Sequence, residues 1–273
     1  MKLSIIIPVY NEVNYLEKFT ENLLNSFEKD DAEFIFINDG STDGSDKLLI
    51  SLINKYKDER FRFHSLKKNK GKGFALREGL KISKGEYILF QDSDLELDTN
   101  DSKEMFEIIC KKIDMEVIFG SRYLSGKLKR NSKLIYLIFG KFNSFIFNIF
   151  FSQSISDVHC GTKIITKKVK ENIELKINDF GFEIDVASQI VKNNFQIYEY
   201  GVSYIARTRE QGKKVTWIDG IKSFFYLIES RFIDNEKAVL LSIIYSAFYM
   251  SFIGSYFGMG IGKILVIFVC FII

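Results

Sequence analysis

The chain of 273 residues is long enough to bury one good-sized core, and its length permits one domain or two. Its formal net charge of +3 is too small to indicate binding to nucleic acid, and three widely spaced cysteines support neither a disulfide framework nor a zinc ribbon. Only two histidines are present, which excludes a histidine-rich metal site.

The first half of the chain alternates between strand and helix patterns. Apolar strand patterns lie at 3–9, 33–37, 61–66, 87–90 and 115–120, and helical spacing lies at 15–27, 45–56, 73–82 and 103–112. This alternation predicts right-handed βαβ units, and therefore an α/β fold with a mainly parallel sheet.

The pattern changes after residue 122. Residues 134–151 are crowded with Ile, Phe, Leu and Tyr, and Lys141 is their only charged residue. Two explanations stay open for this segment, a core helix and an interfacial helix lying on a membrane. A short strand from 163, a helix over 182–192, a strand over 196–206 and a helix over 217–231 are expected next.

The C-terminal part is the most apolar. Residues 238–257 carry no charge, and such a run of 20 residues can cross a bilayer as a helix. A glycine-rich stretch interrupts it, and the apolar run of 10 residues at 264–273 is short for a second span. We expect a folded domain over 1–231 and a membrane anchor over 238–273, with a buried core helix as the alternative. The N-terminus leads into a strand without a signal-peptide pattern.

Acidic residues follow the strand at 87–90. Asp92, Asp94 and Glu96 alternate, so in an extended chain they would project to one side, in the crevice where open α/β sheets bind ligands. Three hard oxygen ligands suit Mg²⁺ or Mn²⁺, and such a metal usually also holds substrate phosphates. Taken alone, these acids are equally well explained as exposed loop residues.

A second acidic turn, at Asp39, follows the strand at 33–37. Adjacent parallel strands would bring both turns to one edge, where Asp39 could accept from a nucleobase or ribose and Asp92 and Asp94 could hold a metal bridging a diphosphate. The stretch Lys70-Gly71-Lys72-Gly73 precedes a helix and could face an anion. Taken alone it is more typical of an ordinary N-terminal turn, because it is not a Walker motif.

Five motifs in order carry a resemblance to a known family. They are Pro8-Val9-Tyr10-Asn11-Glu12, Asn38-Asp39-Gly40-Ser41-Thr42-Asp43, Asn69-Lys70-Gly71-Lys72-Gly73, Gln91-Asp92-Ser93-Asp94-Leu95-Glu96 and Gly120-Ser121-Arg122-Tyr123. Over about 2–227 the chain resembles the inverting, GT-A-fold glycosyltransferases of family 2, in the branch of dolichyl- or polyprenyl-phosphate mannose and glucose synthases. Asn38 stands where the family usually has a first aspartate, and Ser93 where it often has alanine.

The resemblance implies a GT-A nucleotide-binding sandwich and a nucleotide-sugar donor, a UDP- or GDP-hexose. The residues implied around the donor are Pro8, Tyr10, Glu12, Asp39, Lys72 and Asp92. The metal is implied to be Mg²⁺ or Mn²⁺, held by Asp92, Asp94 and Glu96.

An acceptor phosphate is also implied, near Arg122 and near Arg207, Lys213 and Lys214 of the segment 207–214. Arginine grips phosphate bidentately and lysine supplies a point charge. A phosphate monoester is already anionic near neutral pH, so no general base is required. The catalytic residues would then be Asp92, Asp94 and Arg122. A solvated basic loop is the other explanation of these cations, as it is for the cluster at 127–133.

Two further segments resemble the family. Glu183 and Asp185 open the helix at 182–192, and we interpret them as a helix N-terminal charge pattern rather than as acids that support the site. Asp157 and Cys160 lie where the branch has an acid and a small residue near the donor sugar, and a nucleophilic cysteine is not expected because inverting transfer forms no covalent enzyme intermediate.

These observations predict a membrane-anchored inverting glycosyltransferase that moves a hexose from a nucleotide sugar to a polyprenyl phosphate, dolichyl or undecaprenyl, with its catalytic domain facing the cytoplasm. The chain lacks the Glu-Asp and Gln-x-x-Arg-Trp sequences of processive polysaccharide synthases. The alternatives are transfer to a sugar or glycolipid hydroxyl in cell-surface polysaccharide synthesis, and a nucleotide-binding membrane scaffold without turnover.

Overall fold

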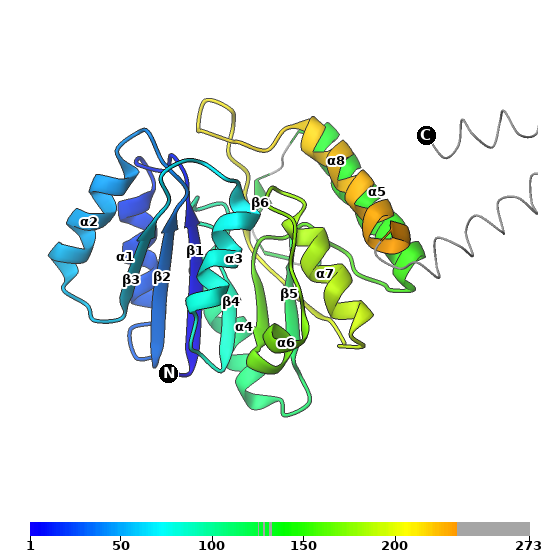
Figure 1. The fold of residues 1–273 in the computed structure, drawn as a ribbon, viewed down its shortest axis with the longest axis horizontal. Helices are drawn as coiled ribbons and strands as arrows, with labels where there is room; N and C mark the ends of the chain where they lie inside the picture. Colours follow the sequence, from blue (N-terminus) through cyan, green and yellow to red (C-terminus); the bar gives the residue numbers. More distant parts are fainter. Residues whose placement is uncertain (125, 128, 131–132, 234–273) are drawn as a thin grey trace, which may run out of the picture. The chain divides into compact units, whose positions relative to one another are not determined.

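The computed structural model describes residues 1–124, 126–127, 129–130 and 133–233 (Figure 1). The chain divides into two compact units, Met1–Tyr226 and Leu227–Ile273, and only 227–233 of the second unit are described. The anchor predicted at 238–273 therefore lies outside the described residues.

The first unit is built on a seven-stranded sheet with the strand order β3-β2-β1-β4-β7-β5-β8. Four of the strand pairs are parallel, and β7 runs antiparallel to both of its neighbours. The expectation of a mainly parallel sheet is thus confirmed. The strands are β1 (Leu3–Val9), β2 (Ala32–Asn38), β3 (Phe61–Ser65), β4 (Tyr87–Phe90), β5 (Val117–Ser121), β7 (Lys163–Thr166) and β8 (Tyr198–Gly201), and a separate two-stranded sheet pairs β6 (Lys129–Arg130) with β9 (Tyr204–Ile205).

Helices cover both faces of the sheet (Figure 1). Alternate residues of β1 face opposite sides, so Ile5 and Ile7 join the core formed with Phe19 of α1, whereas Ile6 packs against Gly79 of α3. Burial on both faces explains why β1 and β2 are continuous apolar runs. The helices are α1 (Leu16–Ser26), α2 (Ser45–Tyr56), α3 (Lys72–Ile82), α4 (Thr99–Lys111), α5 (Leu134–Phe151), α6 (Lys167–Asn172), α7 (Phe182–Lys192) and α8 (Trp217–Ile228), followed by a π-helical turn (Glu229–Ile233).

Two predicted elements differ from the observed ones. Helix α4 begins four residues before the expected position 103, because the Asp98 side chain caps it by accepting from the Asn100 amide at 2.9 Å. The single strand expected at 196–206 is wrong. It is interrupted after β8, where the Ser203 amide donates to the Asp101 carboxylate at 2.6 Å and the chain passes to β9 in the other sheet.

Helix α5 coincides with the predicted segment 134–151. It is the one helix within the described ranges that is long and apolar enough to cross a membrane, and only 22% of it is buried. Its packed side includes Asn143, which donates to the Gly220 carbonyl of α8 at 3.0 Å. At the border of this side, the ring centroid of the half-exposed Phe142 lies 5.9 Å from that of Phe224. The other side exposes large apolar residues, namely Leu134, Ile138, Phe142, Phe145 and Ile149. This exposure is incompatible with a fully buried core helix.

Candidate active site

The acidic turn after β2 is organised by Asp39. Its carboxylate accepts from the backbone amides of Lys70 at 2.8 Å and Gly71 at 2.9 Å, at the start of α3. Burial raises the pKa of Asp39 above its ordinary value and outweighs these two hydrogen bonds. The next residue, Gly40, has a φ of +67°, and a side chain there would collide with the backbone at Lys68. The turn after β2 and the turn between β3 and α3 therefore approach closely, as the parallel pairing of β2 with β3 predicts.

The chain that carries the three acids after β4 is turned rather than extended, and the side chains of Asp92, Asp94 and Glu96 still line one cavity. Leu95 has a φ of +57°, and the Asp94 carboxylate accepts from the Glu96 amide at 3.0 Å, which turns the chain. Glu96 accepts from the Tyr204 hydroxyl at 3.0 Å and from the Arg207 amide at 2.7 Å. In the described part of the chain, no three acidic, histidine or cysteine side chains are grouped so that they could hold a metal ion.

Negative charge is nevertheless concentrated at Asp94. Its burial, together with the charges of Asp92 and Glu96, raises its pKa to about 7 although Arg207 opposes the rise. A divalent cation between carboxylates relieves this kind of repulsion, and oxygen donors are what Mg²⁺ and Mn²⁺ prefer. The chemistry of Asp92 and Asp94 therefore fits a metal, whereas the oxygens of Glu96 accept hydrogen bonds from Tyr204 and Arg207.

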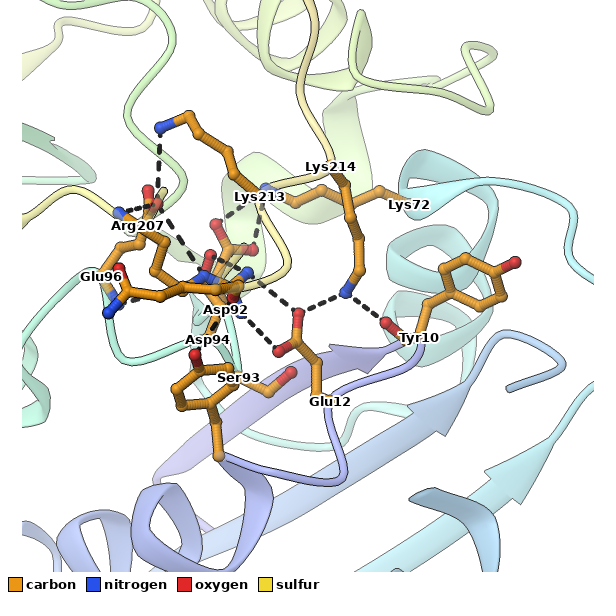
Figure 2. A network of polar contacts seen from close by, with 12 residues as sticks. Tyr10, Glu12, Lys72, Asp92, Ser93, Asp94, Glu96, Arg207, Lys213 and Lys214 are labelled. Atoms are coloured by element: carbon orange, nitrogen blue, oxygen red, sulfur yellow. Dashed lines mark hydrogen bonds and ion pairs between the residues drawn. The ribbon is translucent and has the colours of Figure 1, made fainter. Parts of the chain in front are cut away.

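The cations of the segment 207–214 contact acids of the donor end (Figure 2). Arg207 forms a bidentate pair with Glu12, at 2.7 and 3.1 Å, and also donates to Asp94 at 3.2 Å. Lys214 donates to Glu12 and to the Tyr10 carbonyl, and Lys213 lies 3.4 Å from a Glu96 oxygen. Residues predicted for the acceptor phosphate are thus brought together with residues predicted for the donor and metal.

Arg122 is held by Asp157, the acid that the resemblance placed near the donor sugar but that was not among the predicted site residues. Its Nε and Nη2 donate to the two oxygens of the fully buried Asp157 at 2.7 and 2.8 Å, and the Arg122 amide donates to the same carboxylate. Burial opposes ionisation of Asp157, but the adjacent guanidinium more than offsets it and holds the Asp157 pKa below its ordinary value. The guanidinium also lies over the Tyr204 ring, 5.2 Å from its centroid.

Lys72 at the start of α3 links two acids. Its ammonium lies 2.8 Å from an Asp92 oxygen and 3.0 Å from a Glu183 oxygen. Glu183 lies in the first turn of α7, as interpreted, and it is in addition buried and bound to Lys163 of β7. Asp185, in contrast, accepts from the backbone amides of Lys176 and Ile177. The sequence signal for this cluster was a lysine inside an apolar strand pattern, at Lys163.

These side chains line one cavity of about 640 Å³. It extends from the ends of β1, β2 and β4 to α5 and α8, and also includes Tyr123, Lys129, His159 and Glu183. Lys129, which belongs to the basic cluster interpreted as a solvated loop, therefore faces the cavity. All twelve predicted site residues line it: Pro8, Tyr10, Glu12, Asp39, Lys72, Asp92, Asp94, Glu96, Arg122, Arg207, Lys213 and Lys214.

Solved structures share this fold. Glucosyl-3-phosphoglycerate synthase from Mycobacterium tuberculosis, in complex with phosphoglyceric acid, matches with a TM-score of 0.63 and 13% identity over 84% of this chain and 80% of that chain. The same protein with Mn²⁺, UDP-glucose and glycerol 3-phosphate matches with a TM-score of 0.62 and 13% identity, with the same coverage. The fold is GT-A-like, with a mostly parallel central sheet and an acidic cavity at the strand ends.

The family follows from sequence. Residues 4–174 match the model described as Glycosyl transferase family 2, and the chain belongs to that family. The dolichyl-phosphate beta-glucosyltransferase of Dictyostelium discoideum is 32% identical over 216 residues, which cover 74% of this chain and 66% of the relative. The enzyme of that name from Saccharomyces cerevisiae is 28% identical over 81% of this chain and 71% of the relative. The resemblance found in the motifs is confirmed, and the chain is a glycosyltransferase.

Proposed function

We propose that this chain transfers a hexose, with inversion, from a nucleotide sugar to a membrane polyprenyl phosphate. The observation that carries the proposal is the single cavity, which joins a carboxylate cluster at one end to the apolar helices α5 and α8 at the other. The dolichyl-phosphate beta-glucosyltransferases among the relatives support glucose as the sugar and dolichyl phosphate or a similar lipid as the acceptor. The UDP-glucose complex of a structural neighbour favours UDP over GDP as the carrier.

The donor end would hold the nucleotide and a metal. Pro8, Tyr10 and Glu12 would surround the nucleoside, together with Asp39, which orders the turn before α3. Lys72 would reach the diphosphate from the start of α3, where the helix dipole also favours an anion.

Asp92 and Asp94 would hold Mg²⁺ or Mn²⁺, which as a Lewis acid stabilises the negative charge of the leaving diphosphate. The Mn²⁺ complexes among the structural neighbours support a divalent metal. Glu96 would become a third ligand only by releasing Tyr204 and Arg207, which it contacts in this structure.

The acceptor end carries positive charge that carboxylates do not balance. Among the described residues Lys129 and Lys141 form no ion pair, and their ammonium groups lie 4.8 and 5.5 Å from the centroid of the Tyr123 ring. Burial is the main cause that lowers the pKa of Lys129. The positive charges of Arg122 and of Lys141 lower it further. An acceptor phosphate beside Arg122 would relieve this repulsion and would be positioned to attack the anomeric carbon.

The reaction would need no general base from the protein. An oxygen of the acceptor phosphate would form the new bond to the anomeric carbon as the bond to the diphosphate breaks, and the electron pair would leave with the diphosphate. Two buried acids of this region, Asp157 and Glu183, are each ion-paired, which suits positioning better than proton transfer. Arg207, Lys213 and Lys214 would supply further cations once the donor engages Glu12 and Asp94.

The membrane would approach along α5. The exposed apolar face of α5, with exposures between 45 and 68%, and the exposed Ile218 and Phe225 of α8 border the side of the cavity that would accept the lipid. We interpret α5 as an interfacial helix, with a catalytic domain over 1–231, an anchor helix at about 238–257 and a further apolar segment. A cytoplasmic orientation agrees with the supply of nucleotide sugars.

The test uses the purified full-length chain in detergent, with polyprenyl phosphates, labelled UDP- and GDP-hexoses and Mn²⁺ or Mg²⁺. We expect lipid-linked hexose that is lost on chelation, and we expect Asp94→Asn to abolish transfer without unfolding. Asp114→Asn, at an exposed aspartate after α4, is the matched control and should retain activity. Absence of lipid-linked product with every donor, or transfer only to sugar hydroxyls, would refute the proposal. Wild-type turnover by the Asp94 variant would refute the metal assignment.

A further inference from the structure

Lys163 is a charged residue at the centre of the sheet. It belongs to β7, where it pairs with Phe90 of β4 on one side and with Phe119 of β5 on the other. Its side chain is completely buried. Lysine is almost never fully buried unless it is paired. Its ammonium group donates to the Cys160 carbonyl and binds a Glu183 oxygen at 2.5 Å.

Lys163 is the inner end of a row of four alternating charges. Glu183 uses one oxygen for Lys163 and the other for Lys72, at 3.0 Å. Lys72 in turn binds Asp92 at the cavity, where Figure 2 shows the two side chains. The order is positive, negative, positive, negative, so the row is neutral as a whole. The cavity is lined by Asp92, Lys72 and Glu183, while Lys163 reaches Glu183 from inside the sheet.

Stability alone gives no reason for this arrangement. Removing two charges from water costs more than an apolar pair of similar size, and replacing buried ion pairs by apolar residues is often neutral or stabilising. The row is also packed without spare room, because a side chain at Gly161 would collide with Asp92 and come within 3.2 Å of the Lys72 ammonium. Both features are explained if the row sets the position and the availability of Lys72.

We propose that Lys163 is a positioning residue for the donor: by neutralising Glu183 from inside the sheet, it leaves Lys72 free to turn from Glu183 to the donor diphosphate. This inference rests on the proposed function, because it takes the Lys72 and Asp92 end of the cavity to be the diphosphate site. Without Lys163, the Glu183 carboxylate would have Lys72 as its one cation in this row. Attraction between opposite charges is strong in such a poorly solvated place, so the diphosphate would compete for Lys72 less well.

The decisive experiment compares Lys163→Met with the double variant Lys163→Met/Glu183→Gln. Methionine keeps the length of the lysine stem, and the double variant removes one charge of each sign. For the single variant we expect the KM for the donor to rise about tenfold, equivalent to ~1.4 kcal/mol, with a much smaller change in kcat and in the KM for the acceptor lipid. In the double variant the donor KM should return to within about threefold of wild type, because the Glu183 carboxylate then no longer holds Lys72 back.

The matched control is Lys103→Met, which removes a partly buried lysine from its pair with Asp30, remote from the cavity residues. It should leave the donor KM unchanged, and melting temperatures would be measured for every variant. A lysine with a merely structural role would lower stability without the rescue by Glu183→Gln. If Lys163→Met does not fold, the double variant alone decides, and a donor KM raised tenfold or more in it overturns the inference.

The inference and the proposed function fail in different ways. If the wild-type chain neither transfers hexose nor binds UDP or GDP with Mn²⁺, the proposed function is wrong. If the wild type transfers hexose and the folded Lys163→Met variant keeps the wild-type donor KM, only the role of Lys163 is wrong. A rise in donor KM that Glu183→Gln leaves uncorrected also overturns that role.

Discussion

Variants that remove the Asp157 charge should show that the effect of this acid on stability differs from its effect on hexose transfer. Asp157 is completely buried and makes two hydrogen bonds to the Arg122 guanidinium, whose side chain is 21% exposed toward the cavity. Loss of one partner of a buried ion pair costs roughly 3–5 kcal/mol. Asparagine keeps one acceptor and Arg122 can gain some hydration, so we expect Asp157→Asn to cost about 3 kcal/mol, at the lower end of that range.

For a domain of this size the loss corresponds to a melting temperature lower by about 6–12 °C. The pKa of Asp157 is below its ordinary value of 3.8 in the folded chain, so its contribution is complete above that pH and is lost as the pH falls further. The deficit of the variant should therefore be constant between about pH 6 and pH 8 and shrink below about pH 4.

The double variant Arg122→Met/Asp157→Asn supplies the comparison. It leaves no unpaired charge, so it should recover much of the lost stability, whereas transfer should stay low because the acceptor phosphate lacks its arginine. Thermal unfolding in detergent and lipid-linked product formation measure the two effects. A melting temperature of Asp157→Asn within 2 °C of wild type, or full activity of the double variant, would refute the reasoning.

Three further changes follow from the same contacts. Burial lowers the pKa of His159 to about 4 from 6.5, so between these pH values the folded chain binds fewer protons than the unfolded chain. The free energy of unfolding should therefore fall by at most about 3 kcal/mol as the pH is lowered from 6.5 to 4. His159→Gln should flatten this pH dependence in melting scans. Gly161→Ala should raise the donor KM by displacing Asp92, and an unchanged KM would contradict the packing. Phe145→Ser with Ile149→Ser should weaken transfer to the polyprenyl phosphate while hydrolysis of the donor in detergent is retained, because both side chains are exposed on α5.

The sequence allowed most of the fold to be predicted, because the underlying signals are local. Periodicity and turn residues indicated each strand and helix from β1 to β5, and parallel strands then bring Asp39 and Asp92 to one edge of the sheet. The antiparallel direction of β7 was not predictable, since a four-residue apolar pattern does not indicate direction or neighbours. The position of Lys163 beside Glu183 depends on that direction.

The arrangement of side chains in the site was harder to predict from the sequence. The turn at Leu95 is a single-residue backbone conformation, and Glu96 after it accepts a hydrogen bond from the Tyr204 hydroxyl. The pairing of Arg207 with Glu12 joins residues 195 positions apart, which no local pattern specifies. Composition identified the charged groups, but the tertiary fold decides which of them neutralise each other.

The distribution of charge explains how one cavity could bind two phosphate-bearing substrates, each at its own end. At the donor end, Glu12 is neutralised by Arg207 and Lys214, and Asp92 by Lys72, so little net charge remains there. A nucleotide diphosphate whose charge is largely cancelled by a divalent metal can enter this end by exchanging ion-pair partners, without adding a large charge. At the α5 end, Lys129 and Lys141 form no ion pairs within the described residues, so this end favours a phosphate that arrives without a metal. A polyprenyl phosphate is such an anion, and its apolar chain would leave the cavity along the exposed face of α5. The difference in charge between the two ends would thus assign each substrate to its place before any contact with base or sugar is made.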